Sequence, residues 1–134
     1  MKSVEKPFGK LPDGREVRLF TVRNENGYEL SVMNYGGIIT SFKAPDREGE
    51  VEEITLGYNT LDEYLAGHPF FGATVGRVAN RIKSSGITVD GEYYELSPAP
   101  SHRVHLHGGA EGFDKKLWDA KEVSPTPTSG GVQL

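Results

Sequence analysis

The stretch Val17-Arg-Leu-Phe-Thr-Val22 is followed by Asn24-Glu-Asn-Gly27 and then by Tyr28-Glu-Leu-Ser-Val-Met33. The first and third stretches are rich in β-branched and aromatic residues, and the third alternates between polar and apolar residues. The stretch between them consists of residues that favour turns. Together they predict two antiparallel strands joined by a turn, so an antiparallel sheet is the starting point of the fold.

The rest of the chain continues this pattern of short strand-like segments and turns, with 17 glycines and 8 prolines. Residues 87–96 predict a β-hairpin in which Asp90-Gly91 forms a type I′ turn. One short helix is expected at residues 60–66, where Thr60 and Glu63 provide a capping box. Further strands are expected at residues 38–43, 53–56, 116–123 and 131–134. Many short strands predict a mainly all-β protein, an antiparallel sandwich or barrel.

The composition excludes several classes of protein. The net charge of −4 leaves no basic excess for binding nucleic acid. The sequence has no cysteine, so it has neither disulfides nor a thiolate metal site. The first residues hold no apolar segment of a secretory signal, and no apolar run approaches the length of a membrane span. We expect a cytoplasmic protein of one domain, with no nucleic-acid or membrane partner.

The motifs that could carry chemistry lie in the second half of the chain, in Gly76-Arg-Val-Ala-Asn-Arg-Ile82, Leu106-His-Gly-Gly109, Gly112-Phe-Asp114 and Trp118. They combine guanidinium donors, an amide, an imidazole and flat aromatic faces, which suit a neutral polyol. If residues 71–75 form a buried strand, the polar side chains of the first motif follow its end, where a cleft is expected. Phe70 and Phe71 are adjacent, so only one of them can face the core from a strand.

These motifs, in this order and spacing, resemble the aldose 1-epimerase (galactose mutarotase) family, most closely over residues 70–118. The resemblance implies a large antiparallel β-sandwich of the galactose mutarotase type. It also implies the interconversion of α and β anomers of hexoses such as galactose and glucose, without cofactor or metal. The substrate is then a small-molecule aldose, bound by Asn80, Arg81 and His107.

Among the remaining motif residues, Arg77, Phe113 and Trp118 have two interpretations each. Arg77 is either a further binding residue or a structural arginine that ties down loop carbonyls. Phe113 and Trp118 either stack against a sugar or pack in the core. Asp114 lies in a segment that predicts a turn, in which its carboxylate accepts backbone N–H bonds.

The resemblance also implies two catalytic groups, an acid histidine well after the Leu-His-Gly-Gly motif and a base glutamate near the C-terminal end. Neither has a counterpart before Leu134, so no catalytic residue is assigned in this sequence. We expect residues 1–134 to be the N-terminal part of a single sandwich domain that is truncated within a strand. By themselves they are expected to be inactive.

Two other functions remain open. One is a carbohydrate-binding relative that keeps the sugar pocket without catalysis. The other is a small metal-binding jelly roll of the cupin type, because His105, His107 and Glu111 match part of that motif, although its glycines are absent. On a strand, His105 and His107 would share one face. We expect no metal, interpret His102 as a surface residue, and leave the role of His105, the preferred aldose and the oligomeric state open.

Overall fold

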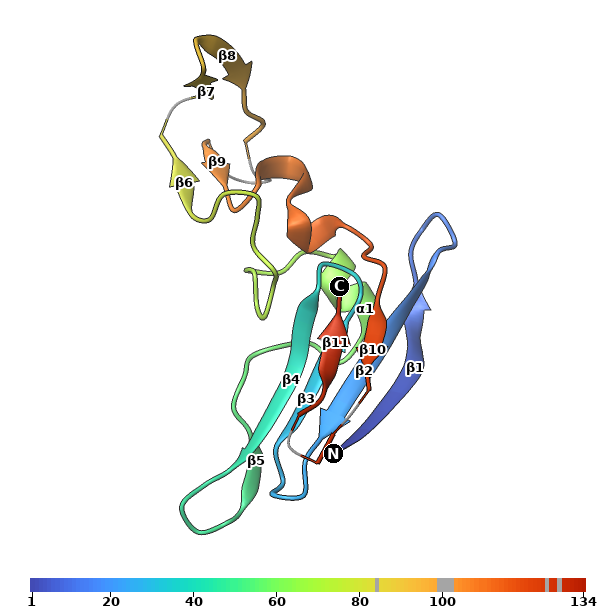
Figure 1. Cartoon of the computed structure of the whole chain (residues 1–134). Coiled ribbons are helices and arrows are strands. Elements are labelled where there is room, and N and C mark those ends of the chain that lie inside the picture. Colours follow the sequence, from blue (N-terminus) through green and yellow to red (C-terminus); the bar gives the residue numbers. More distant parts are fainter. Residues whose placement is uncertain (84, 99–102, 125, 128) are drawn as a thin grey trace.

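The computed structural model describes residues 1–83, 85–98, 103–124, 126–127 and 129–134. Its largest element is a five-stranded antiparallel sheet in which neighbouring strands follow one another along the chain (Figure 1). The strands are β1 (Lys2–Lys10), β2 (Glu16–Arg23), β3 (Glu29–Met33), β4 (Ile38–Pro45) and β5 (Val51–Glu53). The mainly β, antiparallel fold expected from the sequence is therefore confirmed.

Two strands of this sheet differ from the sequence-based expectation. β1 was not expected, because its segment mixes lysines, a glutamate and a proline and buries no residue fully. It forms as an edge strand through backbone pairing with β2. β5 spans Val51–Glu53 instead of residues 53–56, because the carboxylate of Glu53 accepts backbone N–H bonds from Phe42 and Thr55 and so ends the ladder there.

The main core lies between the sheet and the helix α1 (Leu61–Leu65). Its buried members are Leu11, Val17, Leu19, Met33, Ile38, Leu61 and Tyr64. The helix begins at the expected capping box, in which the Thr60 hydroxyl accepts a bond from the Glu63 N–H and the Glu63 carboxylate accepts one from the Thr60 N–H. α1 packs on β1 where Gly9 leaves room for the Leu61 side chain.

A second layer covers the opposite face of the sheet. Leu19 and Phe20 are neighbours on β2 and point to opposite faces, yet both are buried. The hairpin of β10 (Lys121–Val123) and β11 (Gly131–Gln133) lies over this second face (Figure 1). The strand expected at 116–123 starts only at Lys121. The residues before it instead form backbone hydrogen bonds with the turn at 34–37.

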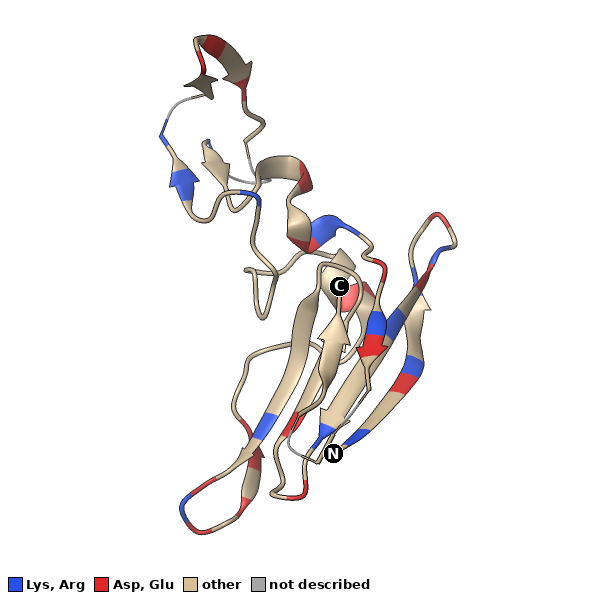
Figure 2. Ribbon diagram, in the orientation of Figure 1, with Lys and Arg blue, Asp and Glu red and all other residues tan. Residues whose placement is uncertain are grey.

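The motif segments lie beyond the end of the sheet, on the side of α1 (Figure 1). They contain β6 (Arg81–Ile82), β9 (His105–Leu106) and two short 3-10 helices, η1 (Gly109–Glu111) and η2 (Phe113–Lys115). The hairpin of β7 (Gly86–Val89) and β8 (Glu92–Glu95) lies between β6 and β9 in the sequence. The β7–β8 hairpin is confirmed, with Asp90 and Gly91 both at positive φ as a type I′ turn requires. Acidic and basic residues are both spread along the described ribbon, in the sheet and in the segments beyond its end (Figure 2). No helix in the described segments has the length and apolarity needed to cross a membrane.

The buried strand considered at residues 71–75 is absent from the described structure. This segment is irregular and crosses the end of the sheet, where Gly72 accepts a bond from the Ile39 N–H and Thr74 donates to the Gly36 carbonyl. Gly72 adopts φ 60°, and a Cβ there would lie 2.0 Å from the Ile39 carbonyl oxygen. This close backbone approach is incompatible with a regular strand and makes the glycine necessary.

Glu53 gives the sheet a pH dependence that can be measured. Burial alone would raise the pKa of Glu53, but hydrogen bonds from Ser41, Thr55 and the Phe42 N–H outweigh it and lower the pKa to about 2. A carboxyl group with a pKa lowered by folding stabilises the protein above its unfolded pKa, and this contribution is lost as the pH falls toward 2. We expect Glu53→Gln to lower the Tm at pH 7 but to differ little from wild type near pH 2. Thermal melts across this range test it, with the exposed neighbour Glu52→Gln as control; an equal Tm difference at both pH values would contradict it.

Candidate functional site

Asn80 and His107 meet at the end of the short β6–β9 ribbon. Arg81 pairs with Leu106 in this ribbon, and one residue further the His107 N–H donates to the Asn80 carbonyl over 3.1 Å. In return the Asn80 N–H donates to Nδ1 of His107 over 3.0 Å. Because Nδ1 accepts this bond, the neutral imidazole carries its proton on Nε2. His107 is thereby set up to offer a ligand one N–H donor in a defined direction.

Both residues have backbones in the left-handed region, with φ 62° at Asn80 and 52° at His107. Such values are uncommon outside glycine and concentrate at functional sites. The expectation that His105 and His107 share one face of a strand is wrong, because β9 ends at Leu106 and the chain turns at His107. Nδ1 of His105 instead hydrogen-bonds the Ser97 carbonyl at 2.8 Å, which gives this histidine a local structural contact.

Arg81 joins the same cluster through the side chain of Asn80. Oδ1 of Asn80 accepts bonds from the Arg81 backbone N–H at 2.9 Å and from its guanidinium at 3.3 Å. The Arg81 side chain is exposed, so its remaining N–H donors face solvent. The structure therefore brings together Asn80, Arg81 and His107, the three residues expected to bind substrate. We call them the polar triad.

Arg77, Phe113 and Trp118 form a second group. The guanidinium carbon of Arg77 lies 5.6 Å from the centre of the Phe113 ring. Phe113 meets Trp118 edge-on at 5.1 Å, and the Trp118 indole N–H donates to the Phe113 carbonyl at 3.1 Å. The two rings are half-buried and contact each other, which is typical of packing. Arg77 thus contacts an aromatic face, where the structural interpretation expected loop carbonyls.

Gly108 follows His107 and lies close to the backbone of Gly76 and Gly112, the neighbours of Arg77 and Phe113 in the sequence. It adopts φ 99°, and a Cβ there would lie 1.9 Å from the Gly76 carbonyl oxygen, which also accepts the Phe113 N–H. We expect Gly108→Ala to destabilise the protein by about 1–2 kcal/mol more than Gly91→Ala, because overpacking adds to the cost of positive φ. Gly91 is the matched control, since it has φ 84° and nothing within 4 Å of its Cβ position. Urea unfolding of both variants measures the difference, and equal losses would show that the contact is unimportant.

Asp114 has surroundings that the sequence did not predict. It was expected to accept backbone N–H bonds in a turn, but the residue is 1% exposed and its carboxylate accepts a bond from Nζ of Lys115 at 2.8 Å. Its other oxygen, Oδ1, has no hydrogen-bond partner among the described residues. Burial lowers the pKa of the nearby His68, and the charge of Asp114 opposes that shift. The charge of the Asp114 carboxylate therefore affects the half-buried His68 and pairs with Lys115.

The three residues of the cupin-like pattern, His105, His107 and Glu111, each interact with a different partner. His105 and His107 use Nδ1 for different backbone groups, and Glu111 pairs with Lys116 at 2.9 Å, which lowers the pKa of Glu111. Among the described residues no group of three or more His, Asp or Glu is placed to hold a metal ion.

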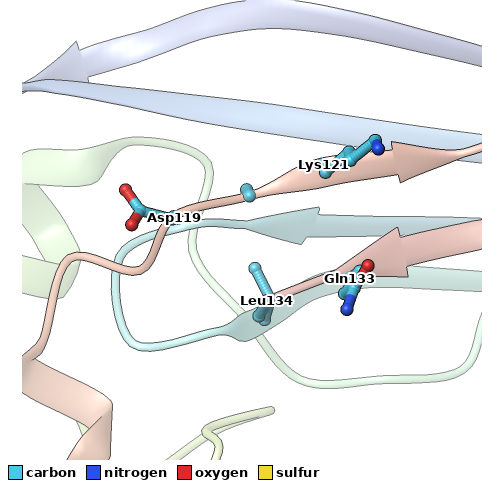
Figure 3. Close-up of a pocket in the computed structure, with 5 residues that line it drawn as sticks. Asp119, Lys121, Gln133 and Leu134 are labelled. Atoms are coloured by element: carbon cyan, nitrogen blue, oxygen red, sulfur yellow. The ribbon is translucent and has the colours of Figure 1, made fainter.

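One hollow on the described surface lies apart from the polar triad. It measures about 300 Å³ and is lined by Asp119, Ala120, Lys121, Gln133 and Leu134, at the open end of the β10–β11 hairpin (Figure 3). Its lining offers one cation and one carboxylate at the rim and no imidazole or guanidinium. The candidate site is therefore defined by the convergence of polar groups at residues 80, 81 and 107.

Known proteins share sequence with this chain over most of its length. A sequence model of the family "Aldose 1-epimerase" matches residues 18–134. Galactose mutarotase from Rattus norvegicus is 42% identical over 128 residues, which are 95% of this chain and 35% of that protein. Aldose 1-epimerase from Escherichia coli (strain K12) is 43% identical over 107 residues, 80% of this chain and 31% of that protein. The chain thus spans about a third of the length of the curated relatives it matches.

Solved structures show the same relationship. Galactose 1-epimerase from Lactobacillus acidophilus NCFM superposes with a TM-score of 0.74 at 26% identity, over 93% of this chain and 35% of that one. The GalM/aldose epimerase homologue from C. elegans superposes with a TM-score of 0.68 at 31% identity, over 85% of this chain and 34% of that one. Sequence and structure agree on the resemblance seen in the motifs, and the chain belongs to the aldose 1-epimerase family.

Proposed function

We propose that these 134 residues are the sugar-binding part of an aldose 1-epimerase that interconverts the α and β anomers of hexoses such as galactose and glucose. The observation that carries the proposal is the polar triad, in which residues 27 positions apart are joined by reciprocal hydrogen bonds. The names of the relatives, galactose mutarotase and aldose 1-epimerase, support the same substrate class.

In this proposal each member of the triad has a separate task. His107 donates its Nε2–H to a sugar oxygen, because its Nδ1 is occupied by the Asn80 N–H. Arg81 grips a pair of neighbouring hydroxyls with its planar donors. Asn80 holds both partners, one through its backbone and one through its side chain. These contacts bind and orient the sugar and transfer no proton.

Mutarotation itself needs an acid and a base. A base takes the proton from the C1 hydroxyl, an acid protonates the ring oxygen, and the bond between C1 and the ring oxygen breaks to give the aldehyde. Rotation about C1–C2 and reversal of these steps on the other face of C1 give the second anomer. We propose that the acid histidine and base glutamate implied by the family lie outside these 134 residues.

A chimera tests the proposal. In it, this chain replaces the 128 matched residues of rat galactose mutarotase. Polarimetry of freshly dissolved α-glucose is expected to show fast equilibration with the chimera and the buffer rate with the 134-residue chain alone. Rapid equilibration by the chain alone would contradict the assignment of acid and base. A folded, inactive chimera, together with sugar binding by the chain in an NMR titration, would instead support the non-catalytic binding relative.

A further inference from the structure

Phe70 has a backbone conformation that its own sequence does not explain. Four non-glycine residues of the described chain have positive φ, namely Phe70, Asn80, Asp90 and His107. Asp90 is accounted for by its type I′ turn, and Asn80 and His107 belong to the polar triad. Phe70, at φ 62°, is a bulky aromatic residue for which this region is unfavourable. Its surroundings must therefore hold it there.

The Phe70 ring lies against the imidazole of His107. The two ring centres are 4.7 Å apart and the planes are tilted by 57°. Behind Phe70, the His68 ring follows edge-on at 6.1 Å, and Tyr64 follows His68 at 5.6 Å. Tyr64 is 2% exposed and belongs to the main core. We call these four side chains the aromatic row; it links the packed core to the histidine of the polar triad.

Lys115 holds Phe70 from another direction. Its ammonium lies 5.7 Å from the centre of the Phe70 ring, within the range of a cation–π contact. The same ammonium donates to the carboxylate of Asp114, which is buried. A charge paired with a buried carboxylate has few alternative positions, because leaving would strand the carboxylate in a low-dielectric environment. The Phe70 ring is thus held by His68 and Lys115 as well as by its backbone.

We propose that Phe70 is a positioning residue for His107. The imidazole then has two restraints, the Asn80 N–H at Nδ1 and the tilted Phe70 ring packed against it. The first selects the tautomer, and the second prevents the ring from rotating away from the Asn80 N–H. Together they hold Nε2–H in one direction before a sugar arrives, which removes part of the ordering cost of binding. The role in turnover rests on the proposed function, whereas the effect on the imidazole does not.

The first experiment measures the imidazole directly in the 134-residue chain. Long-range ¹H–¹⁵N correlation of the histidine rings near pH 8.5 is expected to show one tautomer for His107, with the proton on Nε2. Phe70→Leu keeps an apolar side chain but removes the ring, and we expect the two ¹⁵N shifts of His107 to move toward each other as both tautomers become populated. Phe70→Tyr is expected to restore the wild-type shifts, and Phe70→Met serves as a second ring-free variant if Phe70→Leu folds poorly.

The matched control is the adjacent residue, Phe71. Its ring contacts Tyr58 at 6.0 Å, so Phe71→Leu perturbs the packing nearby without touching the contact to His107. We expect it to leave the His107 shifts unchanged. Unchanged His107 shifts in the ring-free Phe70 variants, or equal changes in Phe71→Leu, would overturn the proposal.

The second experiment asks whether Phe70 acts through His107 in turnover. In the chimera we expect Phe70→Leu to lower kcat/KM about tenfold, whereas Phe70→Tyr should retain most of the wild-type kcat/KM. When His107 is already replaced by asparagine, we expect Phe70→Leu to lower kcat/KM by less than a further twofold. Equal losses in both backgrounds would show an effect that bypasses His107 and would overturn the proposal. If the chimera is inactive while the tautomer of His107 responds as expected, the proposed function fails and the positioning role stands.

Discussion

Replacing His107 with asparagine is expected to lower kcat/KM of the chimera by roughly 30- to 1000-fold, which corresponds to about 2–4 kcal/mol of transition-state stabilisation. Asparagine tolerates the left-handed backbone at this position, and its side-chain oxygen can take the place of Nδ1 as acceptor for the Asn80 N–H. It has no group at the position of Nε2. The variant therefore removes the proposed donor to the sugar while keeping the local turn.

Two further variants show whether the effect comes from the lost donor. His107→Ala is expected to lose as much activity and also some stability, because the Asn80 N–H loses its acceptor. His105→Gln changes a histidine two residues away that contacts the Ser97 carbonyl, and we expect turnover within about threefold of wild type. Coupled enzyme kinetics and thermal melts measure both quantities. Near-normal kcat/KM in His107→Asn would show that His107 does not bind the substrate.

Arg81→Lys is expected to be nearly as damaging as Arg81→Ala, with losses in kcat/KM of about 10- to 100-fold, the range for hydrogen bonds from a charged donor. A guanidinium donates to two oxygens in one plane while it also bonds Oδ1 of Asn80, whereas an ammonium is a point charge without this geometry. If the exposed Arg81 side chain does not contact the substrate, Arg81→Lys will lower kcat/KM only slightly.

Arg77→Lys is the comparison for Arg81→Lys. Arg77 lies three residues from Asn80 and contacts the Phe113 ring, a contact that lysine can partly replace. We expect its effect on kcat/KM to stay below about threefold and its effect on the Tm to be measurable. A larger loss of activity in Arg77→Lys than in Arg81→Lys would exchange the roles assigned to the two arginines.

Local signals in the sequence were sufficient for much of the fold. Residues 17–33 specified two strands and their turn, Asp90-Gly91 specified a hairpin, and Thr60 with Glu63 specified the start of the helix. In each case the interacting residues lie at most 14 positions apart, so turn chemistry, side-chain alternation and capping are visible in a short window. The sequence did not predict the strand β1, because an edge strand can form through backbone hydrogen bonds with little contribution from side-chain packing.

The motifs also carried the family and the choice of Asn80, Arg81 and His107 as candidates, because the residue types themselves determine which hydrogen bonds are possible. Their arrangement was beyond the sequence. The left-handed backbones of Asn80 and His107 are locally unfavourable and are stabilised by bonds across 27 residues. The left-handed backbone of Phe70 is likewise locally unfavourable, and its ring is held by contacts with His68, Lys115 and His107. The irregular path of residues 71–75 across the end of the sheet also depends on hydrogen bonds to distant residues. The sequence alone thus determined most of the strands and turns and the chemistry available. The tertiary structure decided which side chains meet, because contacts between distant residues stabilise conformations that each segment by itself would not adopt.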